Sequence, residues 1–282
     1  MGRFLFASLF TLGLIFGQNI ESRLSVPTDR SDLARTLLRN SLRDRNPDTR
    51  KHAVQALGLL NTSGPWLAQL EAMLDDKDVE VRLAAIASLV DLKGPLTVAT
   101  LQKALGSDVP EVSFAAAKAL WMVGDPSGRK ALESVLNGKT KTSSGFLTKK
   151  RRDARRMMRT PKTLLMFAVM QGANFAPVPG VGGGISSVQG ILSDSSSAGR
   201  AAAALLLSAE ISPGVLEALR DALDDSAWSV RAAAVHAIAI RNESSLQADL
   251  IPLLDDKKDA VRVRAAAGYL RLEALKSVRA AR

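Results

Sequence analysis

The chain of 282 residues has no cysteine, only two histidines, and few aromatic residues, namely eight Phe, three Trp and one Tyr. Without cysteine it forms no disulfide, no thiolate-ligated zinc site or iron–sulfur cluster, and it has no thiol nucleophile. Two histidines are too few for a histidine-rich metal centre. Hydrophobic residues make up 46% of the chain, which is enough for a buried core and argues against a wholly disordered protein.

The N-terminus has the layout of a secretory signal peptide. Arg3 precedes an uncharged stretch, residues 4–18, whose apolar part ends at the small residue Gly17. One positive charge, a short apolar run and a small residue are typical of such peptides, and the run is shorter than the ~20 residues of a membrane-spanning helix. We therefore expect a signal peptide over 1–17, a linker over 18–30, and export to the periplasm, the cell envelope or the medium. A hydrophobic helix packed on the fold and an uncleaved anchor remain alternatives.

A sequence pattern recurs with a period of about 31 residues, which is typical of helical repeat arrays. In each copy a leucine is followed by a polar turn and, eight residues after the leucine, by a position that opens an alanine-rich helix; we call it the ladder position. The leucine and ladder residues are Leu42 and Arg50, Leu74 and Arg82, Leu105 and Ser113, Leu223 and Arg231, and Leu254 and Arg262. Prolines that suit a first helical turn precede several copies, at Pro65, Pro95, Pro126 and Pro213. Because one such helix pair cannot bury its own apolar stripe, the pairs must stack.

One repeat is split. Arg200 lies one repeat period before Arg231, but the matching first helix ends at Leu136. This leucine precedes Arg200 by sixty-four positions instead of eight, a difference of fifty-six. The predicted fold is thus all-α, an α-solenoid of about six helix-turn-helix repeats with the fourth split by a 56-residue insertion. The predicted boundaries are 31–137 for repeats 1–3 and the first helix of repeat 4, 138–193 for the insertion, 194–276 for the rest of repeat 4 with repeats 5 and 6, and 277–282 for a basic tail.

The repeat motifs resemble the HEAT-repeat family, particularly the short repeats similar to those of bacterial phycobilin lyases. The resemblance rests on Asp75-Asp76 with Val81-Arg82 and on the equivalent residues of the last two repeats. It implies a scaffold with varied partners. It also implies a ladder in which ladder arginines pair with turn aspartates of adjacent repeats, through Arg50, Arg82, Arg231 and Arg262 on one side and Asp76, Asp225 and Asp256 on the other. Ser113 departs from the pattern, so we expect the ladder to break at repeat 3.

Nothing in the sequence predicts an active site. A HEAT-repeat enzyme class resembling deoxyhypusine hydroxylase holds two irons with His-Glu pairs, but His52 and His236 are each followed by alanine. The glycines of 180–184 lack the spacing of a dinucleotide or phosphate loop. We therefore predict no catalytic, cofactor-binding or metal-binding residue, no cofactor and no enzymatic activity. An enzyme resembling bilin lyases or repeat hydroxylases is a minor alternative.

The positive charge is concentrated in one segment. Residues 139–162 hold ten bases and one acid, a net charge of +9 out of +10, which leaves 28 bases and 27 acids elsewhere. Such a cluster favours an anionic surface or partner over a solvated charge run without a ligand. The bases expected to make this contact are Lys149, Lys150, Arg151, Arg152, Arg155, Arg156, Arg159 and Lys162.

An uncharged apolar stretch, residues 163–193, follows the basic segment. Each half, on either side of Pro177 and Pro179, is too short to span a bilayer, and a water-exposed loop this apolar is a liability. We expect docking or membrane contact through Leu164, Leu165, Phe167 and Phe175. Three placements stay open, which are a plug on the solenoid, shallow insertion into a membrane, and a contact with a partner chain.

These features together predict an exported, non-enzymatic HEAT-like scaffold for protein–protein interaction. The expected partner is a protein of unknown identity, with an anionic membrane surface as a further partner. The alternative is a solenoid that binds nucleic acid or another polyanion. Nucleic acid does not fit an exported protein, and the basic segment lacks the aromatic residues that stack on single-stranded bases.

Overall fold

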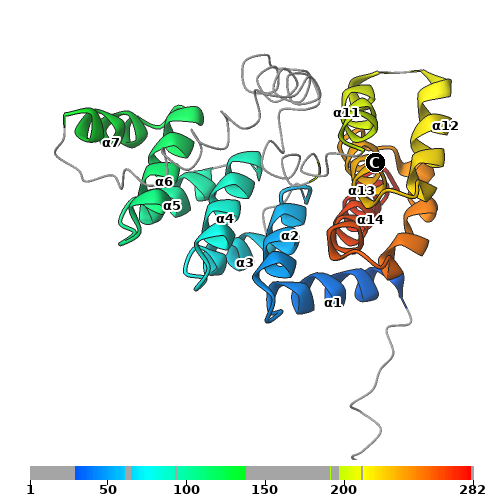
Figure 1. Ribbon diagram of the computed structural model, residues 1–282, viewed down its shortest axis with the longest axis horizontal. Coiled ribbons are helices and arrows are strands. Elements are labelled where there is room, and N and C mark those ends of the chain that lie inside the picture. The colour runs from blue at the N-terminus through cyan, green and yellow to red at the C-terminus, as the bar shows by residue number, and fades with distance from the viewer. Residues whose placement is uncertain are drawn as a thin grey trace, which may run out of the picture.

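The computed structural model describes residues 29–60, 65–92, 95–137, 191, 197–210 and 212–280. These residues form α-helices and short 3-10 turns without a strand, so the predicted all-α fold is confirmed (Figure 1). None of the helices in these ranges is both long and apolar enough for a transmembrane span. The predicted signal peptide, the basic segment and, apart from Ile191, the apolar stretch lie outside the described residues.

The helices pair as predicted in repeats 1, 2, 3 and 5, but not in repeats 4 and 6. The first helices of the repeats are α1 (Arg30–Leu42), α3 (Pro65–Met73), α5 (Pro95–Ala104), α7 (Pro126–Leu136) and α12 (Pro213–Asp221). The second helices are α2 (Pro47–Leu57), α4 (Val79–Leu92), α6 (Pro110–Met122), α11 (Ala198–Leu206), α13 (Trp228–Ile240) and α14 (Asp259–Ala280). In repeat 6 the first helix is replaced by three 3-10 turns, η4 (Ser244–Leu246), η5 (Ala248–Leu250) and η6 (Pro252–Asp255), while η2 (Leu207–Ala209) and η3 (Ala222–Asp224) extend α11 and α12.

Local sequence signals explain where the helices begin. The four prolines singled out above each open a first helix, where a missing N–H is not needed. The side chain of Asp125 caps α7 by accepting a hydrogen bond from the backbone N–H of Ser127 at 3.0 Å, and Asn46 caps α2 in the same way through Asp48 at 3.0 Å.

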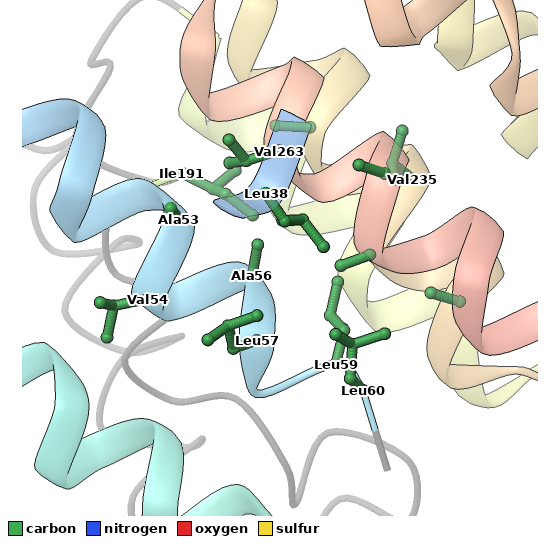
Figure 2. Close-up of a cluster of buried hydrophobic side chains, with 14 of the residues drawn as sticks. Leu38, Ala53, Val54, Ala56, Leu57, Leu59, Leu60, Ile191, Val235 and Val263 are labelled. Carbon is green, nitrogen blue, oxygen red and sulfur yellow. The ribbon is translucent and has the colours of Figure 1, made fainter. Parts of the chain in front are cut away.

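The repeats do not stack simply in chain order. The second helices pack in the order α11, α13, α14, α2, α4 and α6, so repeat 6 packs on repeat 1 (Figure 1). The first and last repeats of the described chain thus lie in the middle of the stack. Figure 2 shows the core at this junction, where Leu38, Ala53 and Val263 are completely buried together with Ile191. One apolar core therefore runs through the junction.

The two helices that flank the insertion lie at opposite ends of the stack (Figure 1). The helix α7 packs on α6, and α11 packs on α13. The sequence period assigns both to the split repeat, yet they are separated by the other repeats. The insertion thus connects one end of the stack to the other.

The helix α7 covers one end of the stack at very short range. A Cβ atom on Gly128 would lie 2.3 Å from the backbone N of Trp121 and 2.7 Å from the carbonyl O of Ala117. Only glycine allows the two backbones to approach so closely. The exposed side of α7 carries an ion pair between Arg129 and Glu133 at 3.3 Å and, at its C-terminal end, the exposed Leu136.

Candidate functional site: the ladder, the repeat 6–1 junction and the ends of the stack

Each ladder arginine first holds the turn of its own repeat. A guanidinium N–H donates to a main-chain carbonyl there, from Nη1 of Arg50 to Asp44 at 2.8 Å, of Arg231 to Asp225 at 2.7 Å and of Arg262 to Asp256 at 2.6 Å. Arg82 does the same through Nε to the carbonyl of Asp76. These bonds satisfy turn carbonyls that would otherwise lack a partner near the end of the preceding helix.

Two arginines also bridge adjacent repeats through buried bidentate pairs. Arg50 reaches both carboxylate oxygens of Asp76 at 2.7 and 2.8 Å, and Arg231 reaches those of Asp256 at 2.7 and 3.0 Å. Burial raises the pKa of Asp76 and Asp256, but hydrogen bonds from the arginine and a backbone N–H outweigh it and keep each pKa below its usual value. Both carboxylates are therefore charged at neutral pH.

The other rungs of the ladder are weaker. Arg82 lies 3.6 Å from Asp108, whose side chain is almost fully exposed, and Arg200 lies 3.2 Å from Asp225 at the end of the stack. At repeat 3 the hydroxyl of Ser113 donates to the carbonyl of Leu105 in its own turn at 2.7 Å. Exposed pairs contribute about 0–1 kcal/mol, so the buried pairs dominate.

Arg262 departs from the expected ladder. The pattern predicts that it reaches a carboxylate of a neighbouring repeat, but it pairs with Asp259 on its own helix. Asp259 in turn accepts a hydrogen bond from the hydroxyl of Thr49 in repeat 1 at 2.6 Å. The reason is the stacking order, because α14 meets α2 rather than a seventh repeat. Sequence reasoning missed Thr49 and Asp259, since residues 210 positions apart show no local signal.

Further polar contacts fix the junction between repeats 6 and 1. Arg271 of α14 donates from Nε to Oδ1 of Asn242 at 2.9 Å and from Nη1 to the carbonyl of Leu59 at 2.6 Å. Glu273 accepts a hydrogen bond from the hydroxyl of Ser31 and lies 3.5 Å from Arg35. Burial lowers the pKa of Arg271, but Arg271 stays charged at neutral pH because arginine begins far above it. These residues were not singled out from the sequence either.

Of the two histidines near this junction, His236 is buried and His52 is half-buried. Burial, together with the positive charge of Arg264, lowers the pKa of His236 to about 3 and that of His52 to about 4. Each imidazole is thus neutral at pH 7. Within the described ranges, no group of three or more His, Cys, Asp or Glu side chains could hold a metal ion.

Large exposed apolar side chains lie mostly near the two ends of the stack. They belong to α5, α6 and α7 at one end and to α11 with η2 at the other, and they are Leu96, Trp121, Met122, Leu136, Leu206 and Leu207. Leu136, which is 85% exposed, lies two residues before the start of the insertion. Exposed apolar surface is common at interaction sites. The basic and apolar residues predicted to make contacts, from Lys149 to Phe175, lie outside the described residues.

The comparison with protein families agrees with this repeat architecture. The family model described as HEAT repeats matches residues 67–142 and 187–271. Among solved structures, the complex of CpcE and CpcF of phycocyanin lyase from Nostoc sp. PCC7120 is 17% identical with a TM-score of 0.33, covering 94% of this chain and 100% of that chain. A designed armadillo repeat protein is 15% identical with a TM-score of 0.24, covering 86% and 100%. An engineered protein is 19% identical with a TM-score of 0.26, covering 86% and 97%. No curated protein matches the sequence significantly.

Proposed function

Because the chain belongs to the HEAT-repeat family, we propose that it is an exported, non-enzymatic scaffold that binds a protein partner. The insertion 138–193 is its specific element for docking or for contact with an anionic membrane surface. HEAT-repeat folds commonly act as scaffolds that present extended surfaces to other proteins. The alternative is a solenoid that binds nucleic acid or another polyanion through the same basic segment.

The observation that carries this proposal is the uneven distribution of charge. The segment 139–162 supplies +9 of the net +10, while the rest of the chain is nearly neutral. A dense cluster of bases followed by apolar residues suits an interface in which electrostatic attraction and apolar burial act together. The exposed Leu136 places apolar surface next to the start of this segment.

Liposome flotation tests the membrane contact. The intact protein should float with anionic vesicles and not with neutral ones, and binding should weaken with added salt because exposed charges are screened. A variant with Arg151, Arg152, Arg155 and Arg156 changed to Gln should lose most of this binding. A salt-resistant remainder would indicate that the apolar stretch enters the lipid.

The matched control removes the same charge from the solenoid. Arg43, Lys77, Lys257 and Lys258 are exposed on the turns of repeats, and changing all four to Gln should leave flotation unchanged. If the intact protein floats with neither kind of vesicle, the membrane contact is excluded. If both variants lose binding equally, net charge is responsible and the segment has no special role.

Export is tested separately by sequencing the N-terminus of the protein recovered from its native host. The mature protein from the cell envelope or medium should begin near Gln18. An intact Met1 in the cytoplasm would contradict export and would make the polyanion-binding alternative the leading one.

A further inference from the structure

The stack consists of two half-stacks joined at one interface. The first half-stack, residues 29–137, contains repeats 1–3 and α7, and the second, residues 191–280, contains Ile191, α11 and repeats 5 and 6. Along the chain they are connected by residues 138–190, and in space they meet where α14 packs on α1 and α2 (Figure 1).

This interface has the features of a recognition surface. Its centre is apolar and fully buried, with Leu38 and Ala53 from the first half-stack against Val263 and Ile191 from the second (Figure 2). Polar contacts also join one half-stack to the other. They are Thr49 with Asp259, Ser31 and Arg35 with Glu273, and Arg271 with the carbonyl of Leu59. Buried apolar residues combined with direct hydrogen bonds are typical of stable protein–protein interfaces.

We infer that α14 and the α1/α2 face form a self-sufficient docking interface, so that the two half-stacks bind each other as separate chains once the connection between them is cut. The covalent connection then acts only by raising the effective concentration of one half-stack near the other. The occupant of the α1/α2 face is thus the C-terminal half-stack of the same chain.

The test uses the full chain with one recognition sequence for a site-specific protease inserted after Gly138. The protein is folded intact, cut, and passed over a size-exclusion column at low micromolar concentration. The two fragments should elute together at the volume of the uncut protein. Mixing untagged cut protein with an excess of cut protein in which both fragments carry a tag should produce mixed complexes that contain one tagged and one untagged fragment. Fragments that elute separately, or that aggregate on cutting, would overturn the inference.

Interface variants show whether this surface is responsible. Thr49→Val with Arg271→Ala removes contacts across the junction, and the uncut variant should keep the helical far-UV circular dichroism of the wild type. After cutting, its fragments should separate at a concentration where those of the wild type stay together. Arg129→Ala on the outer face of α7, away from the junction, is the control and should behave as the wild type. If the junction variant stays together as firmly as the control, the fragments are held elsewhere and the inference is wrong.

Discussion

At the scale of single residues, Arg231, like Arg50, makes two kinds of contact. One end of its guanidinium group holds the turn of its own repeat, and the other holds Asp256 of the next repeat. Only 15% of the arginine side chain and 6% of the aspartate side chain are exposed. Water therefore cannot replace the contacts when one partner is removed.

We predict that Arg231→Ala lowers the free energy of unfolding by about 3 kcal/mol, since it leaves a buried carboxylate without its partner. Arg279→Ala is the comparison, because Arg279 is exposed and makes only a 3.4 Å contact with Ser244. Exposed arginines change stability by about 0.5 kcal/mol or less. Urea unfolding followed by circular dichroism measures both, and equal shifts of the midpoint would contradict the role of the ladder.

The lowered pKa values of the two histidines predict that acid destabilises the protein. Their pKa values lie at about 4 for His52 and about 3 for His236, below the ordinary value of 6.5. On acidification the unfolded chain takes up protons below pH 6.5 while the folded chain does not. Stability present above pH 6.5 is therefore lost as the pH falls toward 4, by about 2 kcal/mol per histidine at pH 5.

Urea unfolding at pH 7 and pH 5 tests this. His236→Leu removes one titrating group, so its stability should fall about 2 kcal/mol less between the two pH values than that of the wild type. Carboxylates titrate alike in both proteins and cancel in the comparison. If the free energy of unfolding falls equally in the two proteins, the pKa of His236 is not lowered in the folded state.

At the scale of single helices, the position of α7 depends on one residue. Gly128 lies against the backbone of α6 at Trp121, Ala117 and Leu120, where a methyl group would overlap main-chain atoms that cannot move aside. At Gly199 in α11 and Gly214 in α12, an added methyl group would have no other atom within 4 Å. Substitution of Gly128 therefore tests the effect of close packing, whereas substitution of Gly199 or Gly214 tests the effect of helix propensity alone.

We predict that Gly128→Ala destabilises the protein by about 1–3 kcal/mol through overpacking. Gly199→Ala should leave stability unchanged or raise it by up to about 1 kcal/mol, because alanine favours helix more than glycine does. Hydrogen exchange should locate the effect of Gly128→Ala in α7 and the facing part of α6. If both substitutions behave alike, α7 does not pack on α6 at this distance.

The repeat period and the prolines identified the helices because both are local signals. Pro65, Pro95, Pro126 and Pro213 begin helices as their restricted φ requires, and the regular spacing of Arg50 and Arg231 reflects contacts between neighbouring repeats. The pairing of Arg262 was not predictable in this way. It depends on Thr49, whose proximity to Asp259 follows from the packing of α14 on α2 and leaves no trace in the repeat period. The eight-residue interval between the leucine and the ladder position was ambiguous at Arg200. Leu192 lies eight residues before Arg200 and satisfies this interval without an insertion, whereas Leu136 satisfies it only with one.

At the scale of the whole molecule, the stacking order determines what the insertion must span. From α11 the second helices proceed through α13, α14, α2 and α4 to α6, which is five steps. With about 9 Å between packed helices, the ends of the stack are about 45 Å apart. The residues between α7 and α11 must bridge this length, whatever else they bind.

Removing residues 139–190 should therefore break the stack, although the period alone suggests that α7 and α11 would rejoin. The remaining connection between Asn137 and Ser197 would reach only about 28 Å when fully extended. Either α14 must leave α1 and α2, or an end helix must detach. Hydrogen exchange should show lost protection at one of these places, and the urea midpoint should fall.

Replacing the same residues with a Gly/Ser linker of equal length is the matched control. Such a linker has a root-mean-square span of about 40 Å, which is enough to connect α7 with Ile191 while Ile191 keeps its buried place in the junction core. The linker variant should retain the stability of the wild type to within about 1 kcal/mol, because the half-stacks are held by their own interface rather than by the insertion. If the deletion and the linker variant were equally stable, α7 and α11 would have to lie close together and the stacking order would be wrong. If both were equally unstable, the insertion itself would contribute to the core. This result would support the first of the three placements given above, in which the apolar stretch packs on the solenoid as a plug.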